Sequence, residues 1–148
     1  MDLSAVIRRA LADESDKVAA IHRLSLDTAM PSLRVRHTPD EDRYYFRTGV
    51  FPACEVWVVD DGGPVGFIAF HEGWIDHLYI HPDHFRRGYG RALLNEAKAH
   101  YPELQAWTFQ KNAGAIAFYE ANGFELVRKT AGEKNEEHEP DALFAWSR

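Results

Sequence analysis

One segment in the middle of the chain constrains the fold more than any other. Residues 74–80 alternate in polarity as a strand does, and Pro82 ends this strand because proline has no N–H to donate. Residues 88–101 then have the apolar spacing of a helix. In the turn between them, Gly88 and Gly90 permit a left-handed backbone and close approach to a ligand. A strand, a glycine turn and a helix in this order can direct backbone N–H groups at an anion.

The remaining pattern alternates between helix and strand. A first helix should be capped by Ser15 and stopped by Pro31, and a second should begin after Pro39, carry acidic residues 40–42 at its positive end and stop at Gly49. Their buried faces should carry Val18, Ile21, His22 and either Leu24 or Ser25 on the first, and Tyr45 and Phe46 on the second. Strands are expected at residues 56–59, 65–70, 104–110, 124–128 and 142–146, and a last helix at residues 113–122.

Length and charge exclude several classes of protein. A chain of 148 residues is expected to form a single domain over residues 1–148, and no apolar run approaches the roughly 20 residues that cross a bilayer. The formal net charge of -6 argues against nucleic acid or an anionic membrane as a partner. Cys54 is the only cysteine, so no internal disulfide can form, and a reducing cytoplasm is the simplest expected location.

Three arginines in the glycine turn suggest an anion site. Arg86, Arg87 and Arg91 fall within six positions of an acidic chain. Alone, such a group is typical of a solvated basic turn, but beside Gly88 and Gly90 it favours a pyrophosphate cradle. The turn lacks the lysine and Ser/Thr of a nucleotide-hydrolysing P-loop, and it also lacks the third glycine of a dinucleotide fingerprint.

Two motifs resemble those of the GNAT superfamily of N-acetyltransferases. The family's pyrophosphate motif, Q/R-x-x-G-x-G/A, is matched by Phe85-Arg86-Arg87-Gly88-Tyr89-Gly90, and a later motif is matched by residues 112–124. Phe85 departs from the usual Gln or Arg. The change is harmless if the family's contact there is through the backbone N–H, but any side-chain contact to the cofactor is lost. The resemblance implies a mixed α/β fold, with a mostly antiparallel sheet of six or seven strands flanked by about four helices. It also implies acetyl-CoA as the co-substrate.

The resemblance further implies where acetyl-CoA would lie. In this family the strand before the turn bulges and separates from the next strand, and the pantetheine arm fills the gap. The N–H of Leu78 is then the expected donor to the thioester oxygen. Asn112 would hold the pantetheine arm or the base-side backbone, although an ordinary turn or helix cap explains it nearly as well. The full set of expected cofactor-binding residues is Leu78, Tyr79, Ile80, Phe85, Arg86, Arg87, Gly88, Tyr89, Gly90, Arg91, Asn112, Ala115, Phe118 and Tyr119.

Tyr119 matches the family's tyrosine near the cofactor sulfur. A phenol stays protonated at neutral pH and could give its proton to the departing thiolate. Gly123 should form a left-handed helix cap that lets Phe124 fold back onto Tyr119. The alternative is therefore that Tyr119 is only a core aromatic residue stacked on Phe124.

The attacking amine must also lose a proton. Candidate bases are Asp76, Glu72 and His77, in that order, because all three lie on or beside the central strand. If the strand alternates regularly, Asp76 shares a face with Trp74 and Leu78. A chain of water molecules, or deprotonation in bulk solvent, remains an alternative.

No metal site is expected. His77, His81 and His84 straddle a strand end and Pro82 without a clear ligand spacing. Cys54 is remote from both motifs, so a covalent acetyl-enzyme is not expected either.

These observations favour an acyltransferase that moves acetyl from acetyl-CoA to a primary amine by direct attack. The alternatives are a non-catalytic acyl-CoA sensor, or transfer of another acyl group or to a hydroxyl. Residues 30–37 and 131–141 are expected to contact the acceptor, a small-molecule or peptide amine that they do not identify. The acidic residues 135–141 are either a solvated hairpin or a guide for a cationic amine. The oligomeric state, including a homodimer, stays open.

Overall fold

The computed structural model describes residues 5–33 and 37–148 and is built around a mixed sheet. Within these residues seven strands follow the order β1-β2-β3-β4-β5-β7-β6. All neighbours are antiparallel except β4 and β5, which confirms the predicted fold class. The strands are β1 (Val6–Arg9), β2 (Glu55–Asp60), β3 (Pro64–His71), β4 (Trp74–Ile80), β5 (Glu103–Phe109), β6 (Glu125–Thr130) and β7 (Asp141–Ser147).

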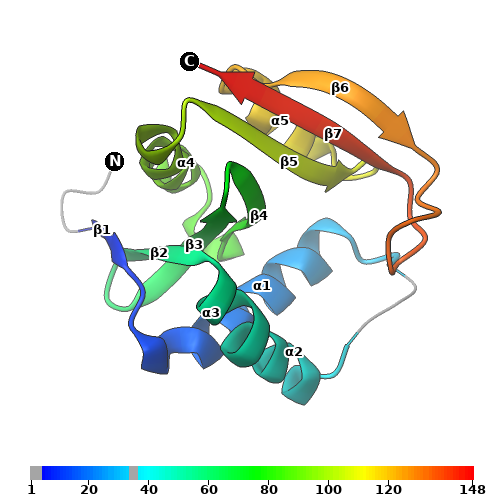
Figure 1. Cartoon of the computed structure of the whole chain (residues 1–148). Helices are drawn as coiled ribbons and strands as arrows, with labels where there is room; N and C mark the ends of the chain where they lie inside the picture. Colours follow the sequence, from blue (N-terminus) through cyan, green and yellow to red (C-terminus); the bar gives the residue numbers. More distant parts are fainter. Residues whose placement is uncertain (1–4, 34–36) are drawn as a thin grey trace.

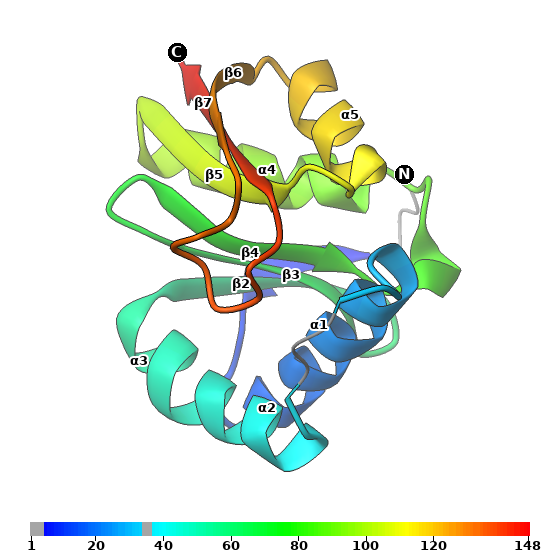
Figure 2. The same cartoon turned by 90° about the vertical axis from the view of Figure 1, so that its right-hand side faces the viewer.

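Helices cover both faces of this sheet (Figures 1 and 2). The helices are α1 (Ser15–Ala29), α2 (Pro39–Tyr45), α3 (Phe51–Ala53), α4 (Tyr89–His100) and α5 (Ala113–Ala121). One apolar cluster joins α4 and α5 to the sheet, and a second joins α1 and the segment after α2 to its other face. No helix in the described ranges is both long and apolar enough to cross a membrane.

The first helix starts where expected, but its cap differs. Ser15 is the first helical residue, and no side chain caps the helix. Glu14 precedes it in a short 3-10 turn, where its carboxylate accepts from the Leu11 N–H at 2.8 Å. Of the two alternatives for the buried face, Ser25 is buried and Leu24 is 44% exposed. Ser15 as the cap was therefore wrong, because Glu14 occupies the preceding position.

The second helix also starts as predicted but continues further. Thr38 accepts from the Glu41 N–H, and the Glu41 carboxylate accepts from the Thr38 N–H, which forms a capping box. A π-helical turn, Phe46–Val50, then leads directly into α3, so the chain does not stop at Gly49. Phe46 is fully buried, whereas Tyr45 is 49% exposed, which corrects its predicted burial.

One strand was missed and one bulge interrupts the predicted alternation. β1 is a four-residue edge strand that pairs with β2, too short to stand out as a pattern. In β4, Ile75 pairs with Phe70 and His77 pairs with Ala69, so Asp76 is an extra residue. The condition of regular alternation is therefore not met at Asp76.

The bulge changes which residues share a face. Ile75 packs in the same apolar cluster as Leu78. Asp76 instead reaches Cys54 on the opposite face of the sheet, which carries the other apolar cluster. Asp76 thus does not share the face of Leu78, as regular alternation would require.

Candidate active site

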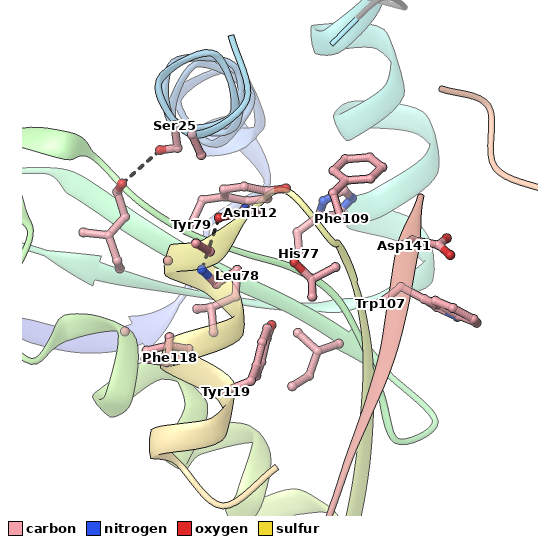
Figure 3. Close-up of a pocket in the computed structure, with 18 of the residues that line it drawn as sticks. Ser25, His77, Leu78, Tyr79, Trp107, Phe109, Asn112, Phe118, Tyr119 and Asp141 are labelled. Carbon is pink, nitrogen blue, oxygen red and sulfur yellow. Dashed lines mark hydrogen bonds between the residues drawn. The ribbon is translucent and has the colours of Figure 1, made fainter. Parts of the chain in front are cut away.

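A cavity of about 1500 Å³ lies where β4 and β5 separate. The two strands pair only at Trp74 with Gln105 and Ile75 with Ala106, and then diverge. The wall of the cavity is formed by residues of α1, β4, the turn before α4, β5 and α5 (Figure 3). All but Arg87 of the expected cofactor-binding residues are part of this wall.

The free side of β4 offers backbone groups to the cavity. In the ladder with β3, His81 N–H donates to the Val65 carbonyl at 2.8 Å. Bonded residues alternate along an antiparallel pair, so the backbone groups of Leu78 and Ile80 point away from β3 toward the separated β5. The Ile80 carbonyl accepts from the Ser25 hydroxyl at 2.9 Å, as the dashed line in Figure 3 shows. The geometry therefore directs the N–H of Leu78 to the cavity side.

The glycine turn has the backbone that an anion cradle needs. Gly88 precedes α4 with φ of 79°, and Arg86 has φ of 65°, both in the left-handed region. A Cβ built on Gly90 would come within 3.1 Å of the Phe118 ring, so a larger residue there would require that ring to shift. The first N–H groups of α4 have no helical acceptor and lie at the positive end of its dipole.

The three arginines of the turn have different surroundings. Arg86 and Arg91 line the cavity. Arg87 instead pairs with Asp61 at 3.4 Å, and the buried Tyr89 donates to the same carboxylate at 2.8 Å. The Arg87 side chain therefore ties the turn to the loop after β2, rather than facing the cavity.

Tyr119 belongs to the core and to the cavity at once. Its ring lies 5.0 Å from that of Phe124, whose N–H donates to the Tyr119 carbonyl as the expected Gly123 cap requires. Yet Tyr119 also lines the cavity, and no described residue hydrogen-bonds to its hydroxyl. Burial raises the pKa of this phenol, which holds it neutral.

Asn112 is the N-cap of α5. Its side-chain oxygen accepts from the Ala115 N–H at 3.1 Å, drawn as a dashed line in Figure 3. Asn112 is therefore a helix cap, as one of the two alternatives predicted, and it also lines the cavity.

The three candidate bases lie in different places. Glu72 is exposed in the β3–β4 turn and is not part of the cavity wall. His77 lines the cavity with Nε2 at 3.2 Å from the Tyr45 hydroxyl, and burial lowers its pKa to about 3. Asp76 lines the cavity and pairs with His71 at 2.9 Å.

The two segments expected to contact an acceptor touch each other, and only the second of them lines the cavity among the described residues. His37 pairs with Glu136 at 3.1 Å, and this hydrogen bond raises the pKa of His37. Residues 34–36 of the first segment lie outside the described residues. Glu133 and Glu137 from the second segment line the cavity, as does Asp141 at the start of β7.

Some lining residues were missed from the sequence. Trp107 and Phe109 of β5 and Ser25 of α1 line the cavity. Trp107 is 39% exposed, and the signal in the sequence is that it alternates in phase with the polar Gln105 rather than with the buried Leu104 and Ala106.

The three histidines considered for a metal do not converge. His81 Nδ1 accepts from the Asp83 N–H, and His84 Nδ1 lies 3.2 Å from an Arg87 nitrogen. His77 lies with Tyr45 instead. Among described residues, a different group of possible metal ligands lies together, namely Cys54, His71 and Asp76.

Comparison with known proteins identifies a shared domain. The family described as "Acetyltransferase (GNAT) domain" matches residues 52–126. Peptidyl-lysine N-acetyltransferase YiaC of Escherichia coli (strain K12) is 38% identical over 73 residues, which are 49% of this chain and 49% of YiaC. The chain thus spans about half the length of that relative.

A second relative and its structural counterpart match over a longer span. Peptidyl-lysine N-acetyltransferase YjaB of Salmonella typhimurium is 29% identical over 126 residues, which are 84% of this chain and 86% of YjaB. The solution structure of apo-form YjaB from Escherichia coli superposes with a TM-score of 0.80 at 27% identity. That superposition covers 96% of this chain and 97% of the other.

Proposed function

The chain belongs to the GNAT family of acetyltransferases, and from this premise we propose that it transfers acetyl from acetyl-CoA to the side-chain amine of a peptide lysine. The observation that carries the proposal is the cavity between the diverging strands β4 and β5. One of its ends is the glycine turn, and its edge is bordered by acidic groups. The lysine is suggested by the names of two relatives, YiaC and YjaB.

The residues present fit acetyl-CoA as a substrate. The left-handed Gly88 has no atom within 4 Å of the place where a Cβ would be, which leaves room for a pyrophosphate against the start of α4. Arg86 and Arg91 supply positive charge beside it. The pantetheine arm would then lie along the free edge of β4, pairing with its backbone groups.

Leu78 would stabilise the charge that develops during attack. When bound, acetyl-CoA supplies an acetyl thioester. The amine nitrogen attacks the thioester carbon, and negative charge gathers on the carbonyl oxygen. The backbone N–H of Leu78, fixed on the cavity side of β4, is positioned to donate to that oxygen.

Tyr119 would assist the leaving sulfur. Because burial raises the pKa of this phenol, complete proton transfer to a thiolate of pKa about 8.5 is uphill. We therefore assign Tyr119 the role of a hydrogen-bond donor that stabilises the thiolate while the C–S bond breaks. The departing CoA thiolate then takes a proton from solvent and becomes the free thiol.

Asp76 is the strongest of the three candidate bases. Glu72 is not in the cavity wall, and a His77 with a pKa near 3 is too weakly basic to take a proton from an ammonium. Asp76 lines the cavity, and its negative charge can attract an ammonium whose proton then passes to water. Glu133, Glu137 and Asp141 add to the attraction for a cationic amine.

A coupled assay of released CoA thiol tests this function. The substrates are a peptide with a blocked N-terminus and one lysine, the same peptide with arginine in place of lysine, and a lysine-free peptide with a free N-terminus. Polyamines, amino acids and aminoglycosides complete the panel. We expect release with the lysine peptide alone, with acetylation of its side chain seen by mass spectrometry.

Two results would contradict the proposal in different ways. Release only with free N-termini or small amines would overturn the lysine assignment. Binding of acetyl-CoA without turnover on any substrate would favour the non-catalytic sensor.

A further inference from the structure

Three side chains from separate segments meet at the end of the sheet half formed by β2, β3 and β4. Cys54 Sγ lies 3.3 Å from Asp76 Oδ2 and 3.8 Å from His71 Nδ1, and the latter two atoms are 2.9 Å apart. None of the three was expected to bind a metal from the sequence. We propose that Cys54, His71 and Asp76 form a binding site for one thiophilic divalent metal ion, with Zn²⁺ as the ion that fits.

Strand register and the bulge bring these residues together. Glu55 pairs with Phe70, so Cys54 and His71 are the next cross-strand neighbours beyond that pair. Cys54 packs on the sheet face that carries α1, and His71, two residues after Ala69 of the same apolar cluster, shares that face by strand alternation. The extra residue in β4 turns Asp76 onto this same face, which is a common effect of a bulge. Without the bulge, the carboxylate would lie on the other side of the sheet.

The spacing of the three ligand atoms matches a tetrahedral metal. Bonds of about 2.3 Å from zinc to sulfur and about 2.0–2.1 Å to nitrogen or oxygen place neighbouring ligand atoms roughly 3.3 to 3.6 Å apart. The observed separations of 2.9, 3.3 and 3.8 Å lie around those values. Small side-chain rotations would therefore suffice to receive the ion.

The donor set selects the kind of metal. One thiolate, one imidazole and one carboxylate suit Zn²⁺, whereas Mg²⁺ and Ca²⁺ prefer oxygen alone. Cys54 donates its thiol hydrogen to Asp76, and a bound metal would replace that proton, which passes to solvent. A thiolate and a carboxylate together balance the two charges of the ion.

The site is open enough for an ion to enter. The side chains of His71 and Asp76 are 38% and 36% exposed, and Cys54 is partly buried. Three protein ligands leave a fourth position for water. Because Asp76 also lines the cavity, a bound ion would lie at the edge of the proposed acceptor region. It would occupy the Asp76 carboxylate, so attraction of the ammonium would then fall to Glu133, Glu137 and Asp141.

Cobalt titration tests the site directly, without any assay of acetyl transfer. Co²⁺ added to the reduced, full chain should bind at one equivalent and give the near-ultraviolet absorption of a thiolate–cobalt bond, which added Zn²⁺ should remove. Cys54→Ser should abolish this absorption. His71→Gln and Asp76→Asn should weaken Co²⁺ binding by roughly 100-fold, since even indirect partners of metal ligands change affinity 10- to 100-fold. His100→Gln is the matched control, because His100 also lies beside carboxylates, those of Glu55 and Glu96, but has no thiol near it.

Thermal melting gives a second measurement that does not depend on cobalt. Zn²⁺ at 100 times its Kd should raise the Tm by roughly 5 to 10 °C in the parent and in His100→Gln, but not in Cys54→Ser. Melting of each variant without metal checks that it folds. Absence of the thiolate absorption in the parent, or an equal response in Cys54→Ser, would overturn the site. Either result leaves the proposed acetyl transfer untouched.

Discussion

Tyr119 touches both the aromatic core and the cavity, and one substitution separates these two roles. Tyr119→Phe keeps the ring and its contact with Phe124 but removes the hydroxyl that faces the cavity. We expect kcat to fall about 10- to 100-fold, because the departing thiolate loses a hydrogen bond of the kind made to charged groups, worth roughly 1.5 to 3 kcal/mol. Affinity for acetyl-CoA and the Tm should change little.

The control for this substitution is Tyr101→Phe. The Tyr101 hydroxyl accepts from the Glu72 N–H outside the cavity, so its loss should leave kcat unchanged. A kcat for Tyr119→Phe within about twofold of the parent corresponds to less than roughly 0.5 kcal/mol of barrier, and it would reduce Tyr119 to core packing.

Residue positions that depend on distant partners could not be predicted from the sequence. The motif match identified Gly88, which is the left-handed N-cap of α4, and Gly90, which lies in the first turn of that helix, because their backbone requirements are local. Arg87 looked equivalent to Arg86, but Asp61, 26 residues away, draws its side chain from the cavity. No local pattern carries that information.

At the scale of the element, comparing two helix caps can distinguish a stabilising role from a role in binding acetyl-CoA. Thr38 caps α2 and Asn112 caps α5, each through a side-chain oxygen. Thr38→Ala and Asn112→Ala should each lower the free energy of unfolding by about 1 kcal/mol. Asn112→Ser should keep most of the cap while removing the amide. If the amide holds the pantetheine arm, this serine variant loses acetyl-CoA affinity without losing stability.

Chemical denaturation and calorimetry measure the two effects. Thr38→Ala should leave acetyl-CoA affinity unchanged, because Thr38 is not among the residues that line the cavity. Full acetyl-CoA affinity in Asn112→Ser would show that Asn112 is a cap alone.

Helix and strand cores were predictable, whereas their ends and irregularities were not. The apolar spacing of α4 and the left-handed Gly123 after α5 are local signals, and both predictions held. Gly49 looked like a helix end, but the chain continues there in a π-helical turn whose residues Phe46 and Val50 are buried. The bulge at Asp76 leaves no mark in the sequence, because it arises from pairing with β3.

At the scale of the whole molecule, two neutral histidines should make stability depend on pH. His22 and His77 lie with ring centres 5.1 Å apart among aromatic side chains, and burial lowers their pKa values to about 4 and about 3. Between those values and the unfolded pKa of about 6.5, the unfolded chain binds more protons than the folded one. Stability should therefore be full above about pH 6.5 and fall as the pH is lowered.

Melting temperatures at about pH 7 and about pH 5 test this sign. His22→Phe should reduce the drop in Tm between the two values, whereas His138→Asn, at an exposed loop position, should not. The raised pKa of His37 adds stability as the pH falls toward about 6.5, so it opposes part of the drop, but to the same extent in the parent and in both variants. An equal drop in His22→Phe and the parent would contradict the role of burial.

The cavity itself is a property of the whole fold. The order of elements was visible in the sequence, but only the family resemblance implied that β4 and β5 would separate. Their divergence after two paired positions depends on long-range pairing of β5 with β7 and on α5 packing beside them.

The central claim is that the turn before α4 holds the pyrophosphate of acetyl-CoA, and two glycines allow a matched test of it. Gly88 and Gly62 have φ of 79° and 74°, and a Cβ on either meets no atom within 4 Å. Gly88→Glu and Gly62→Glu thus add the same charge and similar backbone strain at different places. Calorimetry of acetyl-CoA binding should show no measurable binding to Gly88→Glu and nearly parental affinity for Gly62→Glu, with both variants folded. Parental affinity in Gly88→Glu would contradict the account.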